Sequence, residues 1–102
     1  MFQRCNLYQS SKPSPGSEVF TTLFQNKTIR VESIRSWLKD SGEWYDQSED
    51  EWVVLIEGKA RLEIGGEILT LEKGDCLFIP SHQRHRVLWT SEDALWLGVF
   101  SS

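Results

Sequence analysis

The sequence predicts an all-β domain, either a sandwich or a barrel. Short segments rich in β-branched and aromatic residues recur along the chain, and turn signals separate them. No long amphipathic helical pattern interrupts this series. The chain has 102 residues, which is the size of one domain, and its five Trp and five Phe supply the apolar area for a single core.

The first seventeen residues differ in composition from the rest. The run from position 10 to position 17 holds two prolines and a glycine, which resist a helix and cannot donate a complete ladder of hydrogen bonds. We therefore expect residues 1–17 to form a loose N-terminal arm. Residues 18–102 then form the single domain.

The domain is expected to begin with a pair of antiparallel strands. Residues 19–25 and 28–34 have strand composition, and the Asn-Lys pair between them is typical of a turn. Residues 36–40 are too few for a stable helix, and a Ser-Gly pair ends them. We expect a strand end or a single turn at this position.

Six further strands are expected in the remainder of the chain. Gly65 and Gly66 indicate a two-residue hairpin turn, because both positions of such a turn favour a positive φ. Pro80 ends a strand, because it has no N–H for the ladder. The expected strands are residues 51–56, 60–64, 67–71, 76–79, 86–89 and 95–100.

The strand at residues 51–56 is apolar on both of its faces. Alternation places one set of side chains on one face and a second set on the other. The first set is Glu51, Val53 and Leu55, and the second is Trp52, Val54 and Ile56. A small barrel covers its own inner face, so we expect the outer face to be covered by the N-terminal strands or by a second subunit, which would make a homodimer.

Charge and cysteine content argue against several classes of protein. The net charge is -4 and the basic residues are scattered, whereas nucleic-acid binding needs a clustered positive face. Cys5 and Cys76 do not form a disulfide framework, which favours a reducing, cytoplasmic location. The N-terminus has no positively charged segment followed by an apolar run, so we do not expect secretion. No apolar stretch approaches the ~18 residues of a membrane span, so we do not expect membrane insertion.

Two polar stretches carry the residues suited to chemistry. Residues 44–51 lead into a strand and end at its first residue, Glu51. Residues 80–85 follow another strand and contain both histidines, His82 and His85. We expect the two stretches to meet inside one small barrel.

The first stretch resembles the first motif of the cupin family, which reads G-x5-H-x-H-x3,4-E-x6-G. Glu51 and Gly58 match the second half of this motif at the right spacing. Tyr45 and Gln47 occupy the two histidine positions, and alternation directs both to the same side.

The second stretch resembles the second cupin motif, which reads G-x5-P-x-G-x2-H-x3-N. Gly74, Pro80 and His85 match it in spacing, while His82 replaces its glycine and Trp89 its asparagine. The resemblance covers residues 42–89 and implies a jelly-roll β-barrel.

The resemblance also implies a site for one divalent metal inside the barrel. Carried over residue by residue, Glu51 and His85 remain as standard ligands and Gln47 becomes a third candidate through its amide oxygen. Tyr45 is then a catalytic candidate, as an acid–base group or as a hydrogen-bond donor to substrate. The alternative is a hydrogen-bond network of these four side chains around a metal-free pocket.

Other noticeable residues receive structural interpretations. We expect His82 to lie at the rim with a solvated side chain and Cys76 to be a small buried hydrophobe. The bulky aromatic residues are expected in the core or an interface, with one or two in the pocket wall; they are Trp44, Trp52, Phe78, Trp89 and Trp96.

Three functional classes remain open at this point, because cupins host many unrelated roles. The first is a metal-dependent enzyme acting on a small organic molecule by oxygenation, isomerisation or hydrolysis. The second is a metal-free module that binds or senses a small molecule. The third is a structural dimer with a vestigial pocket. The sequence does not decide whether the protein is an enzyme.

Overall fold

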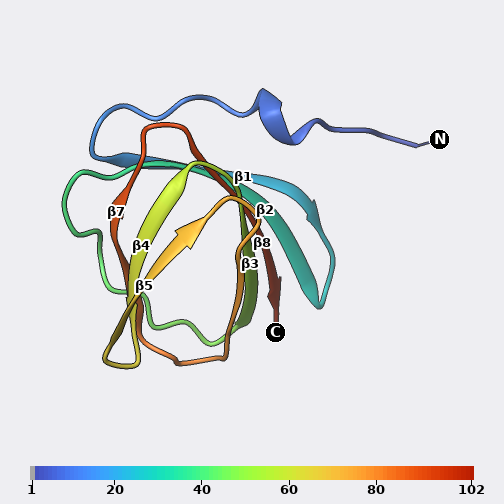
Figure 1. Ribbon diagram of the computed structural model, residues 1–102. Coiled ribbons are helices and arrows are strands. Elements are labelled where there is room, and N and C mark those ends of the chain that lie inside the picture. Colours follow the sequence, from blue (N-terminus) through green and yellow to red (C-terminus); the bar gives the residue numbers. More distant parts are fainter. Residues whose placement is uncertain (1) are drawn as a thin grey trace.

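A computed structural model describes residues 2–102, and almost all of its regular structure is β-strand (Figure 1). A three-residue 3₁₀ turn, η1, lies in the N-terminal segment at Leu7–Gln9. The strands are β1 (Ser17–Gln25), β2 (Ile29–Trp37), β3 (Asp50–Glu57), β4 (Lys59–Ile64), β5 (Glu67–Glu72), β6 (Cys76–Ile79), β7 (His85–Thr90) and β8 (Ala94–Ser101). No helix within residues 2–102 is long and apolar enough to cross a membrane.

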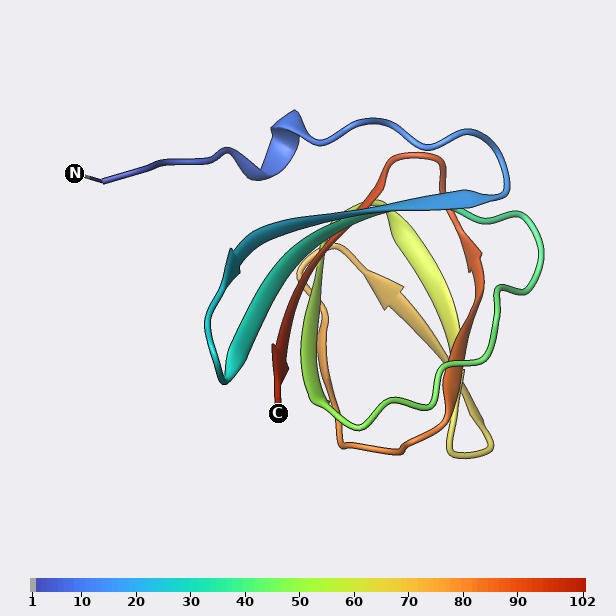
Figure 2. The ribbon, with the colours of Figure 1, turned by 180° about the vertical axis from the view of Figure 1, so that it is seen from behind.

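The strands form two antiparallel sheets that face each other. One sheet has five strands in the order β1-β2-β8-β3-β6, and the other has three in the order β5-β4-β7. The C-terminal strand β8 therefore lies between β2 and β3, as both ribbon views show (Figures 1 and 2). This arrangement confirms the prediction of an all-β, jelly-roll barrel.

Every predicted strand is present, with ends that differ by up to three residues. The largest difference is at β2, which continues to Trp37, so the short segment that follows residue 34 is a strand end. Gly65 and Gly66 have φ values of 57° and 78°, as a two-residue turn with two positive φ angles requires. Local turn chemistry therefore predicted the β4–β5 hairpin correctly.

The core lies between the two sheets. On β3, alternation turns Glu51, Val53 and Leu55 inward, and all three are buried. Leu55 has no exposed surface, while Trp52 on the opposite face is 41% exposed. The inner face of β3 is thus the one that carries the glutamate of the first motif.

The outer face of β3 is not covered by the N-terminal strands. β1 and β2 extend the same sheet beyond β8, so the prediction that these strands cover the face is wrong. The N-terminal segment reaches only one end of it, where Tyr8 donates to Glu57 at 3.2 Å and Arg35 donates to the Tyr8 carbonyl at 3.0 Å. Trp52 and its cross-strand neighbour Phe78 remain exposed.

Cys76 lies on this same outer face, opposite Val54 of β3. The side chain is exposed, so the prediction that it is buried is wrong. The apolar run of β6 gave no indication of this, because its second face is turned to solvent rather than to the core.

Candidate functional site

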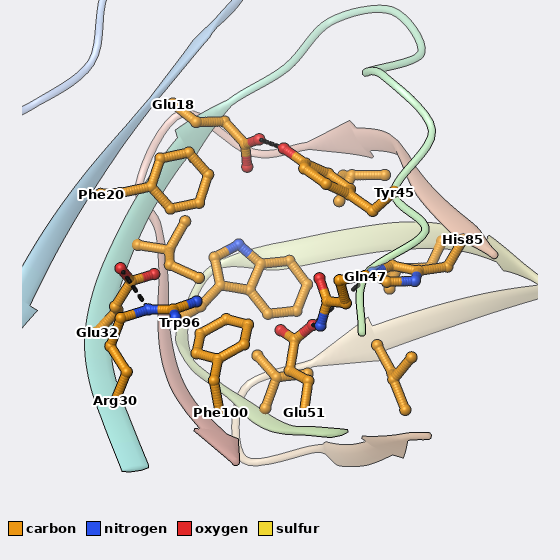
Figure 3. Close-up of a pocket in the computed structure, with 15 residues that line it drawn as sticks. Glu18, Phe20, Arg30, Glu32, Tyr45, Gln47, Glu51, His85, Trp96 and Phe100 are labelled. Carbon is orange, nitrogen blue, oxygen red and sulfur yellow. Dashed lines mark hydrogen bonds and ion pairs between the residues drawn. The ribbon is translucent and has the colours of Figure 1, made fainter. Parts of the chain in front are cut away.

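The barrel encloses a cavity of about 180 Å³ that is open at one side. Strands of both sheets and the loop before β3 contribute to its wall (Figure 3). The polar or charged residues that line it are Glu18, Arg30, Glu32, Tyr45, Gln47, Glu51 and His85. The apolar ones are Phe20, Ile34, Val53, Leu62, Ile79, Val87, Trp96 and Phe100.

All four residues predicted for the site line this one cavity, and a backbone contact explains how two of them meet. The Tyr45 N–H donates to the His85 carbonyl at 2.7 Å, and the His85 N–H donates to the Tyr45 carbonyl at 3.1 Å. This bridge holds the loop against the first residue of β7. The centroids of the Tyr45 and His85 rings are 5.6 Å apart, and both rings point into the cavity (Figure 3).

Glu51 and His85 face each other deep in the cavity wall. Their side chains are only 9% and 6% exposed, and Glu51 Oε1 lies 3.8 Å from His85 Nε2. The opposite ring nitrogen of His85 lies 2.9 Å from the Gln83 carbonyl. A carbonyl only accepts, so in the neutral ring Nδ1 carries the proton and Nε2 is an acceptor directed at Glu51.

Gln47 completes this group of three. Its amide nitrogen donates to Glu51 Oε1 at 3.1 Å. Burial raises the pKa of Glu51, and this hydrogen bond and the nearby His85 only partly oppose the effect. A buried carboxyl with a raised pKa is a group whose charge state depends on what occupies the cavity.

The raised pKa of Glu51 leads to a prediction about stability. Between the ordinary pKa and the raised one, the folded state binds more protons than the unfolded state, so the free energy of unfolding falls as pH rises through this range. The variant Glu51→Gln is therefore expected to lose this decline and to unfold at a higher denaturant concentration than wild type at neutral pH. Denaturation at several pH values measures both effects.

Glu72→Gln is the matched control, because Glu72 is exposed on β5 and its change leaves the cavity intact. A destabilised Glu51→Gln at neutral pH would contradict the prediction. It would mean that a partner such as protonated His85 stabilises the Glu51 charge more than burial opposes it.

Tyr45 is held by a residue that the sequence did not indicate. Its hydroxyl donates to Glu18 Oε1 at 3.2 Å, and Ser36 donates to the other Glu18 oxygen at 2.5 Å. Burial, reinforced by Glu18, raises the pKa of Tyr45. The Tyr45 phenol therefore stays protonated at neutral pH, which favours a role as hydrogen-bond donor over a role as general base.

One side of the cavity comes from β1 and β2, which the predicted site did not include. Glu18, Phe20, Arg30 and Glu32 all point inward from these strands. Their period of two was visible in the sequence, but a strand with mixed polar and apolar faces does not reveal which face turns inward. The pairing of β2 with β8 determines which face of β2 turns inward, because Arg30 then lies opposite the inward-facing Phe100.

His82 lies outside the cavity lining, on the loop that faces the entry loop. Its side chain is 69% exposed, and Nδ1 is 2.9 Å from Asp46. Its backbone N–H donates to the Gln47 carbonyl at 2.6 Å, and its φ is 60°. The positive φ explains why the cupin motif has glycine at this position.

The donor atoms around Glu51 determine how well this part of the cavity suits a metal ion. The separation of 3.8 Å between Glu51 and His85 leaves room for one ion, because metal–ligand distances are about 2.0–2.2 Å. Within residues 2–102, however, no cluster of three His, Cys, Asp or Glu side chains is close enough to hold an ion. The third member is the amide of Gln47, a weak ligand, so the set suits an exchangeable ion and does not fit a tightly held resident metal.

Comparison with known proteins identifies the architecture. The sequence profile of the cupin domain matches residues 39–100, which is more than half of the chain. A candidate mannose-6-phosphate isomerase from Ralstonia eutropha JMP134 is 33% identical, with a TM-score of 0.84 and coverage of 98% of both chains. An RmlC-like cupin from Shewanella frigidimarina is 21% identical, with a TM-score of 0.74 over 91% of this chain and 84% of the other, and is similar in fold alone.

A shorter similarity connects the chain with the tetracenomycin polyketide synthase protein TcmJ of Streptomyces glaucescens. The two are 38% identical over 45 residues, which is 44% of this chain and 30% of TcmJ. The chain thus matches less than a third of that protein's length. The profile match, the two sheets and the positions of Glu51 and His85 together show that this chain belongs to the cupin family.

Proposed function

We propose that this cupin binds a small organic molecule in its barrel cavity, with Gln47, Glu51 and His85 as the polar contacts. The observation that carries the proposal is the pair of buried acceptors, Glu51 and His85, directed at each other across 3.8 Å. A ligand hydroxyl or amine that donates to both would satisfy them.

The size and lining of the cavity support this role. A volume of about 180 Å³ is roughly that of six water molecules, which suits a ligand of modest size or one end of a larger ligand. The aromatic rings of Phe20, Trp96 and Phe100 form an apolar wall among the polar groups (Figure 3). Small-molecule sites combine these two features.

The names of the relatives do not transfer directly to this cavity. A sugar phosphate needs cationic groups for its phosphate, and the cavity lining holds three glutamates and one arginine. That arginine, Arg30, is already bound by Glu49 at 2.6 and 3.0 Å. The lining therefore gives no support for a mannose-6-phosphate isomerase activity in this chain.

The catalytic role predicted for Tyr45 stays a prediction. Its proton is directed to Glu18, and its raised pKa favours the neutral phenol. We place Tyr45 in the wall of the ligand site, where its ring packs beside His85.

The experiment that tests the proposal compares two aromatic residues of the same strand. A small-molecule screen by ligand-observed NMR, with calorimetry of the hits, is run on wild type, Phe20→Ala and Phe24→Ala. Phe20 lines the cavity and Phe24 does not, yet they are 50% and 54% exposed. Hits are expected to bind Phe20→Ala roughly tenfold more weakly and Phe24→Ala as wild type, because only Phe20 contacts the ligand.

Two outcomes would reject the proposal. One is a broad screen without a hit, which would favour a structural protein with a vestigial pocket. The other is a set of hits whose affinities change equally in both variants, because the ligands would then bind outside the barrel.

A divalent metal is the second candidate occupant. The contact that favours it is the one between His85 Nδ1 and the Gln83 carbonyl, since metal-ligating histidines commonly donate their second N–H in this way. We expect a weak site, with a dissociation constant of about 10 μM or higher for Mn²⁺ or Zn²⁺, because only one carboxylate and one imidazole are strong donors. Titration calorimetry on protein prepared without a histidine tag measures it.

The two histidines provide a matched pair for this titration. His85→Ala is expected to abolish metal binding, and His82→Asn to preserve it, because Asn tolerates the positive φ and His82 lies outside the cavity. Metal uptake that survives His85→Ala, or no uptake by wild type, would exclude this candidate.

We also propose that a second copy of the chain covers the outer face of the five-stranded sheet. Trp52 and Phe78 are neighbours in register and are 41% and 56% exposed. Val54, Leu97 and Val99 continue this apolar surface across β3 and β8. A two-fold interface is self-complementary, so one apolar sheet face is sufficient to form it.

A further inference from the structure

The lining of the cavity is unbalanced in charge. Glu18, Glu32 and Glu51 supply three carboxylates, and among residues 2–102 Arg30 is the one lysine or arginine side chain in the lining that faces them. Glu49, outside the lining, binds both terminal nitrogens of this guanidinium. The positive charge of Arg30 is therefore shared with a carboxylate outside the cavity, and the three carboxylates of the lining outnumber its one guanidinium.

Two of these carboxylates are poorly solvated. The side chains of Glu32 and Glu51 are 14% and 9% exposed. Glu32 receives one contact, from Arg30 Nε at 3.1 Å to Oε2, and Glu51 receives one, from Gln47 to Oε1. The second oxygen of each has no hydrogen bond within the described part of the chain, so each can accept one from a ligand.

The aromatic wall beside these carboxylates favours a cation. The Arg30 guanidinium already lies over the Phe100 ring, 4.4 Å from its centroid. Trp96 lies between Phe20 and Phe100 in the close-up view (Figure 3). Aromatic faces next to carboxylates bind ammonium groups better than neutral or anionic groups of the same size.

His85 adds a requirement for a hydrogen-bond donor. Its side chain is only 6% exposed, and in the neutral ring Nε2 is an acceptor directed toward Glu51. A quaternary ammonium has no N–H to give, whereas a protonated primary amine has three.

We propose that the ligand of this cavity carries a protonated amine, which is held between Glu51, Glu32 and the aromatic wall and donates to His85. This inference rests on the proposed function, because it names the chemical class of the ligand that the cavity binds. Glu32 is then a residue that determines specificity, and it lies outside the part of the chain matched by the cupin profile.

The test uses three probes of nearly equal shape and different charge. Benzylamine, benzyl alcohol and benzoate are titrated by calorimetry at neutral pH and constant salt, on protein dialysed against a chelator so that no metal competes. Benzylamine is expected to bind with a dissociation constant of about 1 mM, since a ligand of roughly eight non-hydrogen atoms has limited affinity. Benzyl alcohol is expected to bind roughly tenfold more weakly, and benzoate more weakly still.

Two glutamate variants test whether the Glu32 carboxylate contributes to amine binding. Glu32→Gln is expected to weaken benzylamine binding roughly fivefold to tenfold and to leave benzyl alcohol unchanged, because it removes a charge and retains the shape. Glu63→Gln is the matched control, since Glu63 is also paired with an arginine, Arg86, but does not line the cavity. It is expected to leave both affinities unchanged.

Each outcome separates this inference from the proposed function. If benzyl alcohol or benzoate binds as tightly as benzylamine, the amine is rejected while ligand binding in the cavity stands. If benzylamine is preferred but Glu32→Gln behaves like Glu63→Gln, the assignment to Glu32 is rejected. If none of the three binds at about 10 mM while the broad screen yields hits that depend on Phe20, only this inference fails.

Discussion

Gly58→Ala is expected to destabilise the protein by about 3 kcal/mol, because the new side chain combines backbone strain with a clash. Gly58 has a φ of 87°, and a Cβ built there would lie 2.9 Å from the Ala94 Cα and 2.5 Å from the Ser91 hydroxyl. That hydroxyl accepts from the Lys59 N–H at 2.9 Å and connects the β3–β4 turn to the β7–β8 turn. Chemical denaturation followed by tryptophan fluorescence measures the loss.

Gly74→Ala measures the cost of backbone strain without a clash, so its difference from Gly58→Ala gives the contribution of the clash. Gly74 has a similar φ of 92°, but nothing lies within 4 Å of the position of its Cβ. This variant is expected to lose only about 1 kcal/mol, from backbone strain. Equal losses in the two variants would contradict the role assigned to the contact between the turns, and would leave φ as the sole reason for glycine at position 58.

The double variant Trp52→Glu/Phe78→Glu is expected to be a monomer if the wild-type protein forms the proposed dimer. Both residues lie on the outer face of the sheet, in register with each other, so two carboxylates there would repel each other and their copies across a two-fold axis. Because both side chains are already partly exposed, the monomer is expected to stay folded. Analytical ultracentrifugation at about 10 μM protein gives the mass of each species.

Ile68→Glu is the control for this change of surface character. Ile68 is 63% exposed on β5, in the other sheet, and its substitution is expected to leave the dimer intact. A wild-type protein that sediments as a monomer would reject the dimer. A double variant that remains dimeric would move the interface to another face of the molecule.

The cavity combines residues from the segment that matches the cupin profile with residues that precede this segment. Glu51 and His85 lie within the segment that matches the cupin profile, residues 39–100. Glu18 and Glu32 lie before it, on β1 and β2. The two N-terminal strands thus contribute charged side chains to the cavity wall, and in our proposal these side chains select the ligand.

Much of the fold and the centre of the site could be predicted from the sequence. Strand composition, the Gly65-Gly66 turn and Pro80 are local signals, so they predicted the succession of strands along the chain and most strand ends to within one residue. Motif spacing predicted that Glu51 and His85 meet, because it reports the positions of residues relative to two strands of a known barrel.

Tertiary structure alone decided which face of each outer strand turns inward. Alternation assigns Glu18 and Glu32 to faces of their strands, but the pairing of β2 with β8 directs them into the cavity. Another non-local pairing, that of β6 with β3, places Cys76 on the outer face of the sheet, where it is exposed, against expectation. The sequence by itself therefore determined the strands, the turns and the Glu51–His85 pair, and the packing of distant strands determined the charge of the cavity, because no local signal records which strands become neighbours.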